Sequence, residues 1–161
     1  MSFVEKLGPH LPFLRRYARA LTGSQSSGDA YIRASLAALA ESPEMFDEEL
    51  SPRLALYRFF HAIWSNTGAE LEGAESGAGE DPADKRLQSL APLHRQAFLL
   101  TSLEGFTLQE ASQILNQSTD EVTEMINKAQ SEVESELRTK VLIIEDEPII
   151  AADLEQIVTD L

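Results

Sequence analysis

The chain has 161 residues, no cysteine and a formal net charge of −14 at pH 7. The lack of cysteine excludes a disulfide framework, a thiolate zinc site and a cysteine nucleophile, and the acidic balance argues against general affinity for nucleic acids or anionic membranes. No apolar run approaches the roughly 18 residues of a membrane span, and the N-terminus lacks a basic-then-apolar signal, so we expect a cytoplasmic protein.

The first third of the chain predicts three helices. Apolar residues recur at steps of three and four from Phe3 to Leu21, and we expect Gly8-Pro9 and Pro12 to divide this helix into a short first turn and a main part. A second helix is predicted from about Ser27 to Glu41, and Ser42-Pro43 starts a short third one.

A strongly apolar helix, predicted from Leu54 to about Thr67, follows Ser51-Pro52. It has two apolar faces, whereas one is enough for the core of a small helical module. The second face therefore needs cover from another helix, from a second module or from a partner's amphipathic helix. A core role is favoured for each single side chain, although aromatic residues are also frequent interface anchors. The candidate partner-binding residues of this kind are Leu56, Tyr57, Phe59, Trp64 and, further along the chain, Phe98.

The composition changes between residues 68 and 84. This stretch holds four of the eight glycines, six acidic residues and only one large apolar residue, Leu71. Such a segment cannot bury enough surface to order itself. We therefore predict a helical module over residues 1–69, an acidic flexible linker over 70–83 and a second helical module over 84–138.

The second module has the pattern of a helix-turn-helix. A helix is predicted from Pro92 to about Leu103. Thr107 and Glu110 then make a capping box for the next helix, and Asn116 can take the left-handed conformation that ends it. The last helix of the motif is predicted from about Thr119 to Leu137, with one apolar stripe.

This last helix has the wrong charge for reading DNA. A recognition helix normally carries basic and amide side chains into the major groove. Here residues 118–138 include six acids and two bases. Glu121 and Glu124 would be repelled by phosphate and can pair with basic residues of a protein partner, so we take them as candidate partner-binding residues and expect no DNA binding.

The end of the chain breaks the helical pattern. Val141 to Ile144 is a continuous apolar run rich in β-branched residues, which is typical of a buried parallel strand. Acidic residues follow, and then Ile149 to Leu161 shows helical spacing. We therefore predict a β-α fragment over residues 140–161.

Three segments resemble known families. The stretch LPFLRRYARALTG, from Leu11 to Gly23, resembles the opening helix of region 2 in extracytoplasmic-function sigma factors, and the stretch from Leu90 to Leu115 resembles region 4 of the same factors. The stretch KVLIIEDEP, from Lys140 to Pro148, resembles the first strand and acidic pocket of a response-regulator receiver domain. A sigma-like part before a receiver is the arrangement of PhyR-type regulators of the alphaproteobacterial general stress response, which the chain resembles over nearly its whole length.

This resemblance implies sigma-factor mimicry by an anti-anti-sigma factor. Such a regulator captures an anti-sigma factor, called NepR in this family, and frees the true sigma factor by partner switching. The departures from the sigma pattern agree with a loss of DNA binding. Where sigma factors place arginines, the last helix of the motif has Thr123, Met125 and Gln130, and only Lys128 is cationic.

For the receiver part, the resemblance implies that Glu145 and Asp146 are the acidic pair that helps to hold Mg²⁺ in an intact receiver. The phosphoacceptor aspartate would lie beyond Leu161, so we expect no phosphorylation, no tight metal site and no cofactor in this chain, which we take to end inside a receiver. An intact protein would engage a histidine kinase through its receiver, which would mask the sigma-like surface until phosphorylated. Without it, we expect constitutive partner binding.

The predicted fold class is all-α, with two small helical modules plus the β-α fragment. Two other functions stay open from the sequence: a genuine DNA-binding sigma factor or transcription regulator, and a receiver-linked dimerisation module. We predict no enzyme. His10, His61 and His94 lie far apart in the sequence, and no serine has the pattern of a nucleophile elbow.

Overall fold

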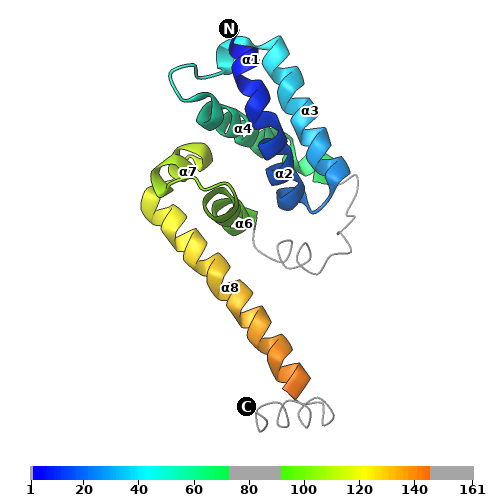
Figure 1. The fold of residues 1–161 in the computed structure, drawn as a ribbon, viewed down its shortest axis with the longest axis vertical. Coiled ribbons are helices and arrows are strands. Elements are labelled where there is room, and N and C mark those ends of the chain that lie inside the picture. The colour runs from blue at the N-terminus through cyan, green and yellow to red at the C-terminus, as the bar shows by residue number, and fades with distance from the viewer. Residues whose placement is uncertain (1, 73–91, 146–161) are drawn as a thin grey trace.

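The computed structural model describes residues 2–72 and 92–145, and every regular element in these ranges is a helix (Figure 1). The predicted all-α class is confirmed for this part of the chain. Most of the predicted linker and residues 146–161 of the predicted receiver fragment lie outside the described residues.

The first module is built from four α-helices and two short 3₁₀ turns. In chain order they are α1 (Phe3–Leu7), η1 (Gly8–His10), α2 (Leu11–Thr22), α3 (Gln25–Glu41), η2 (Pro43–Met45) and α4 (Pro52–Glu72). The expected division of the first helix is confirmed, because η1 separates α1 from α2. α2 ends at Gly23, whose φ of +74° is left-handed, and the Ser24 hydroxyl then caps α3 by accepting from the backbone N–H of Ser27.

α2 and α3 cross closely because Gly28 has no side chain. A Cβ at Gly28 would lie 2.9 Å from the backbone nitrogen of Arg19, so any larger residue would push the two helices apart. Beside this crossing, Arg15 of α2 donates two hydrogen bonds to Asp29 of α3, at 2.8 and 2.9 Å. This bidentate pair lies at the surface and holds the two helices in register.

The core of the first module is aromatic and centres on α4. Phe60 is fully buried, and its ring lies 6.1 Å from Tyr17 and 6.4 Å from Tyr31. Trp64, one turn along α4, packs against Tyr31 with 4.3 Å between ring centres. α4 thus supplies the apolar surface on which α2 and α3 pack, and it runs to Glu72, beyond its predicted end near Thr67.

The second module contains the predicted helix-turn-helix. Its elements are α6 (Pro92–Phe98), the π-helical turn η3 (Leu99–Leu103), α7 (Leu108–Leu115) and α8 (Thr119–Glu145). Both hydrogen bonds of the capping box between Thr107 and Glu110 are present at the start of α7. Asn116 ends α7 in the expected left-handed conformation, with φ of +53°. Val122 and Ala129 of α8 are fully buried, whereas Val133 is half-buried, so the apolar stripe packs best near its start.

The predicted strand at Val141–Ile144 is wrong, because α8 continues as a helix through these residues to Glu145. A β-strand needs neighbouring strands to pair its backbone N–H and C=O groups, and the described residues contain no strand. A helix satisfies the same groups within one segment. The β-branched run indicated strand propensity, but propensity is a weak guide where no sheet is available.

The two modules pack directly on each other. Buried apolar residues of both belong to one continuous cluster. α7 packs on α4 and η3 packs on α2, whereas Figure 1 shows α8 extending away from the first module. In the described ranges, no helix has both the length and the apolar content to cross a bilayer.

Candidate partner-binding site

One contact between the modules lies at the turn that joins η3 to α7, beside the packing of α7 on α4. Gly105 in this turn has a φ of +72°, a conformation that is strained for any residue with a side chain. It allows Glu104 and Phe106, on its two sides, to be buried together against the first module. We call the contact of Glu104 and Phe106 with Arg16, Arg53 and Tyr57 the seam.

The carboxylate of Glu104 lies at the centre of the seam. Its side chain is only 1% exposed. One oxygen accepts a hydrogen bond from Arg16 of α2 at 3.1 Å, and the other accepts one from the Tyr57 hydroxyl of α4 at 2.8 Å. Arg53 of α4 lies 3.8 Å from the second oxygen and also donates to the backbone carbonyl of Glu104. The buried charge is therefore both paired and hydrogen-bonded, as a buried carboxylate requires.

On the other side of the turn, Phe106 makes a cation–π contact with Arg53 and an edge-on ring contact with Tyr57. The guanidinium carbon of Arg53 lies 4.0 Å from the centre of the Phe106 ring. Phe106 in turn meets Tyr57 nearly edge-on, with 4.9 Å between ring centres. Arg53 and Tyr57 thus each contact both the Glu104 carboxylate and the Phe106 ring. The polar and the aromatic contacts of the seam therefore share the same two residues of the first module.

A second buried polar pair lies next to the seam, inside the first module. The Tyr17 hydroxyl forms a hydrogen bond of 2.7 Å with Nε2 of His61. Burial lowers the pKa of His61 to about 3, so the ring is neutral at pH 7. Burial also raises the pKa of the Tyr17 phenol well above its ordinary value, and burial followed by the neighbouring Glu104 carboxylate raises the pKa of Tyr57. Both phenols therefore remain protonated hydrogen-bond donors.

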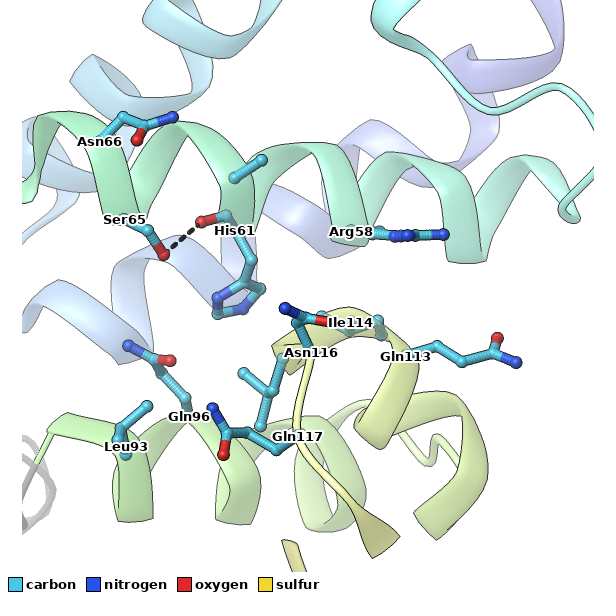
Figure 2. Close-up of a pocket in the computed structure, with 12 residues that line it drawn as sticks. Arg58, His61, Ser65, Asn66, Leu93, Gln96, Gln113, Ile114, Asn116 and Gln117 are labelled. Carbon is cyan, nitrogen blue, oxygen red and sulfur yellow. Dashed lines mark hydrogen bonds between the residues drawn. The ribbon is translucent and has the colours of Figure 1, made fainter. Parts of the chain in front are cut away.

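His61 also borders a cavity of about 370 Å³ between α4 and the second module. Figure 2 shows His61 pointing from α4 toward α6 and the end of α7. The cavity is rich in uncharged amides, namely those of Asn66, Gln96, Gln113, Asn116 and Gln117. Amide side chains match the hydrogen-bonding groups of a polypeptide backbone, so the lining is suited to a protein segment.

The candidate anchors of α4 are buried in this arrangement. Leu56, Tyr57, Phe59 and Trp64 each expose less than a tenth of their surface. Helices of the first module and the turn of the second module cover them, which agrees with two of the three kinds of cover expected for the second face of α4. Phe98 of α6 is half-buried against the shared core. Their role in partner binding stays a prediction.

The acidic side chains at the start of α8 are exposed. Glu121 caps its own helix, because its carboxylate accepts from the backbone N–H of Ser118 at 2.8 Å, and this bond lowers the pKa of Glu121. Glu124 pairs with Lys128 one turn later, at 2.9 Å. These local bonds leave the carboxylates at the surface, where together with Asp120 they give this turn a negative potential. Their contact with a partner is likewise untested and stays a prediction.

The magnesium pair implied by the receiver resemblance has no described geometry. Glu145 is the last residue of α8, and Asp146 lies outside the described residues. The strand that places such a pair in a receiver is replaced by helix. The assignment of Glu145 and Asp146 as metal ligands therefore stays a prediction, and no step of the function below depends on it.

The contacts of Glu104 with Arg16 and Arg53 were not predicted from the sequence. Glu104 follows an apolar stretch and precedes a glycine, so locally it indicates only the end of a helix. Its partners lie 47 to 88 residues away in the chain. The one indication in the sequence was the second apolar face of α4, which has to be buried against another part of the protein. That face does not reveal which residues bury it.

Comparison with known families accounts for both modules. The family model for the sigma2 domain of PhyR matches residues 7–61, and the model for the sigma-like domain of the response regulator PhyR matches residues 87–136. The two matches fall in the first and second modules respectively.

Three relatives match across most of the chain. The phyllosphere-induced regulator PhyR of Methylorubrum extorquens is 43% identical over 162 residues; the match covers 100% of this chain, which spans 60% of that protein. The co-crystal structure of the anti-anti-sigma factor PhyR with the anti-sigma factor NepR from Bartonella quintana is similar at 37% identity and a TM-score of 0.72, over 99% of this chain and 60% of that one. The NMR structure of the PhyRSL–NepR complex from Sphingomonas sp. Fr1 is similar at 43% identity and a TM-score of 0.71, over 84% and 88%.

Proposed function

The chain belongs to the PhyR family, and from this premise we propose that it is a sigma-factor mimic that binds a NepR-like anti-sigma factor. Binding sequesters the anti-sigma factor and frees the true sigma factor for transcription of general stress response genes. The activity is an exchange of protein partners and involves no catalysis by this chain.

The observation that carries the proposal is the charge at the start of α8. The helix-turn-helix fold is intact, with its capping box, its left-handed Asn116 and its buried Ala111. The helix that would enter the major groove nevertheless exposes Asp120, Glu121 and Glu124 in its first turns. Each of these carboxylates repels phosphate, whereas each can attract a basic protein segment. A sigma-like shape with reversed charge supports binding to a protein that recognises sigma factors and disfavours binding to a promoter.

The relatives support the identity of the partner. Two PhyR proteins that are 37% and 43% identical to this chain have been solved with NepR. One of these matches aligns over 84% of this chain and 88% of its relative, so it covers the two modules with little else. We therefore place the binding activity in the two modules themselves.

We further propose that regulation comes from a receiver domain in the intact protein. Phosphorylation by a histidine kinase would shift the population from an arrangement that masks the sigma-like surface to one that exposes it. Mg²⁺ would be needed only for that receiver chemistry. The present chain, which spans 60% of its curated relative, would bind its partner without phosphorylation, in the cytoplasm where sigma factors act.

A titration tests the proposal and its main alternative together. Calorimetry with purified NepR from Bartonella quintana is expected to give saturable binding at one-to-one stoichiometry, which weakens but persists as salt is raised. A parallel titration with promoter DNA is expected to give no binding at any salt concentration. Salt-sensitive, sequence-specific DNA binding would favour a working sigma factor instead. Self-association without NepR binding would favour a dimerisation module.

A further inference from the structure

Glu104 differs from every other acidic residue that the structure describes. It is the only acid among their buried polar side chains, which otherwise are Ser35, His61, Arg95 and Gln96. A buried carboxylate is strongly unfavourable unless charged and hydrogen-bonding partners surround it. All the side-chain partners described above for Glu104 belong to the other module.

The seam is therefore asymmetric. The second module contributes one carboxylate and one ring, on a turn that Gly105 shapes, and the first module contributes the groups that neutralise and cover them. If the modules separated, Glu104 and Phe106 would both have to be hydrated again. Arg16 and Arg53 are half or one third exposed even when docked, so they can be hydrated in either state. Glu104 and Phe106 therefore contribute to the free-energy difference between the docked and undocked states, together with the apolar core that the two modules share.

We propose that Glu104 is a positioning residue that locks the second module onto the first in the arrangement that receives the partner. The partner-binding part of this inference rests on the proposed function. A partner that contacts both modules loses less conformational entropy on binding when the modules are already held in place. The chain as a whole is similar to the relative solved with NepR, at a TM-score of 0.72 over 99% of its length, which is compatible with binding by the docked modules.

The central variant is Glu104→Gln, which keeps the size of the side chain and can still accept from Tyr57 but removes the charge that pairs with Arg16 and Arg53. Asp29→Asn is its matched control. It removes the carboxylate of the bidentate Arg15–Asp29 pair, and Arg15 is adjacent to Arg16 on α2. That pair lies within the first module. Tyr57→Phe is the second variant, because it removes one hydrogen bond to Glu104 and retains the ring against Phe106.

The first readout is the distance between the modules in the free chain. Since the chain has no cysteine, Ala37→Cys on α3 and Ser131→Cys on α8, both exposed, can carry spin labels without background. We expect one narrow distance distribution for the parent and for Asp29→Asn, and a broad one for Glu104→Gln, with Tyr57→Phe in between. Circular dichroism is expected to show unchanged helix content in all four proteins. A narrow, parent-like distribution in Glu104→Gln would overturn the lock, and should that variant fail to fold, the same result in Tyr57→Phe would do so.

The second readout is affinity for purified NepR from Bartonella quintana. Glu104→Gln is expected to bind about five- to tenfold more weakly than the parent, and Asp29→Asn equally well, because the coupling between docking and binding is of ordinary allosteric size. Broadened distances with unchanged affinity would overturn the positioning role. Failure of the parent itself to bind NepR would contradict the proposed function, whereas the distance measurement would still decide whether Glu104 locks the modules.

Discussion

The seam and the start of α8 both depend on acidic side chains of the second module, but they differ in where those side chains find their partners. At the seam, Glu104 is buried and bonds to Arg16 and Tyr57 of the other module. On α8, Glu121 and Glu124 are exposed and bond within their own helix. A buried carboxylate fixes long-range structure because its partners cannot be replaced by water, whereas an exposed one leaves structure nearly unchanged and remains available to a ligand.

This contrast predicts that changes at or beside the seam alter stability, and that changes on α8 alter binding. The largest expected effect is that of acid on His61, whose pKa burial lowers from 6.5 to about 3. Between these values the unfolded chain binds more protons than the folded chain, so stability is fully present above about pH 6.5 and is lost as the pH falls toward 3. The loss amounts to about 5 kcal/mol in total.

His61→Gln is the variant that isolates this effect. It is expected to be less stable than the parent at neutral pH, since the fit to Tyr17 is lost, but to lose less additional stability in acid. Urea denaturation from neutral pH down to about 4 measures both slopes. Parallel slopes for the parent and His61→Gln would contradict the account of a buried neutral imidazole.

The next effect is expected from Phe106, the buried ring of the seam. Phe106→Ala should reduce the free energy of unfolding by about 3 kcal/mol, because the ring packs on Tyr57 and Arg53 and leaves a cavity when removed. The matched control is Phe13→Ala, whose ring also lies under an arginine, Arg16, at 5.4 Å but is 50% exposed. It should change stability by at most about 1 kcal/mol. Equal losses in the two variants would show that seam burial is not what matters.

A smaller effect is expected where the seam turn ends and α7 begins. Thr107→Ala removes the hydroxyl that accepts from the backbone N–H of Glu110, and should reduce stability by about 1 kcal/mol. Thr123→Ala is the control, because Thr123 lies inside α8 and its hydroxyl only donates to the carbonyl of Thr119. That change should be neutral or slightly stabilising. Thermal denaturation compares the two; a Thr107→Ala protein as stable as the parent would contradict a structural role for the capping box.

The smallest effect on stability, and a clear effect on binding, is expected from charge reversal on α8. Asp120→Lys combined with Glu124→Lys should reduce the free energy of unfolding by less than about 1 kcal/mol, through loss of the pair with Lys128 and of a favourable charge at the helix N-terminus. It should weaken binding of NepR by about tenfold at low salt. The same change in charge at the exposed Glu44 and Glu48 of the first module is the control, and it should affect binding much less. If both double variants weaken binding equally, only net charge is involved and the α8 face has no special role.

Local signals predicted both ends of α7 well, whereas α4 and α8 extend beyond their predicted ends. The capping box at Thr107 and the left-handed Asn116 are read from a few adjacent residues, and both are present. The strand prediction at Val141–Ile144 was wrong, because a run rich in β-branched residues forms a strand only when neighbouring strands are present to pair with it. Glu104 could not be identified as a site residue, because its partners lie on α2 and α4 and meet it only in the folded chain. The need to cover the second face of α4 was predictable, whereas the residues that cover it were not.

The most direct test of the central claim is release of a sigma factor. A preformed complex of a NepR protein with its sigma factor, with a fluorescent label on the sigma factor, is titrated with this chain. We predict that the sigma factor is released in step with the chain added, and that promoter DNA is then bound by the released sigma factor alone. A sigma factor that stays bound to NepR at saturating chain, or a promoter fragment bound by the chain itself, would contradict sigma-factor mimicry.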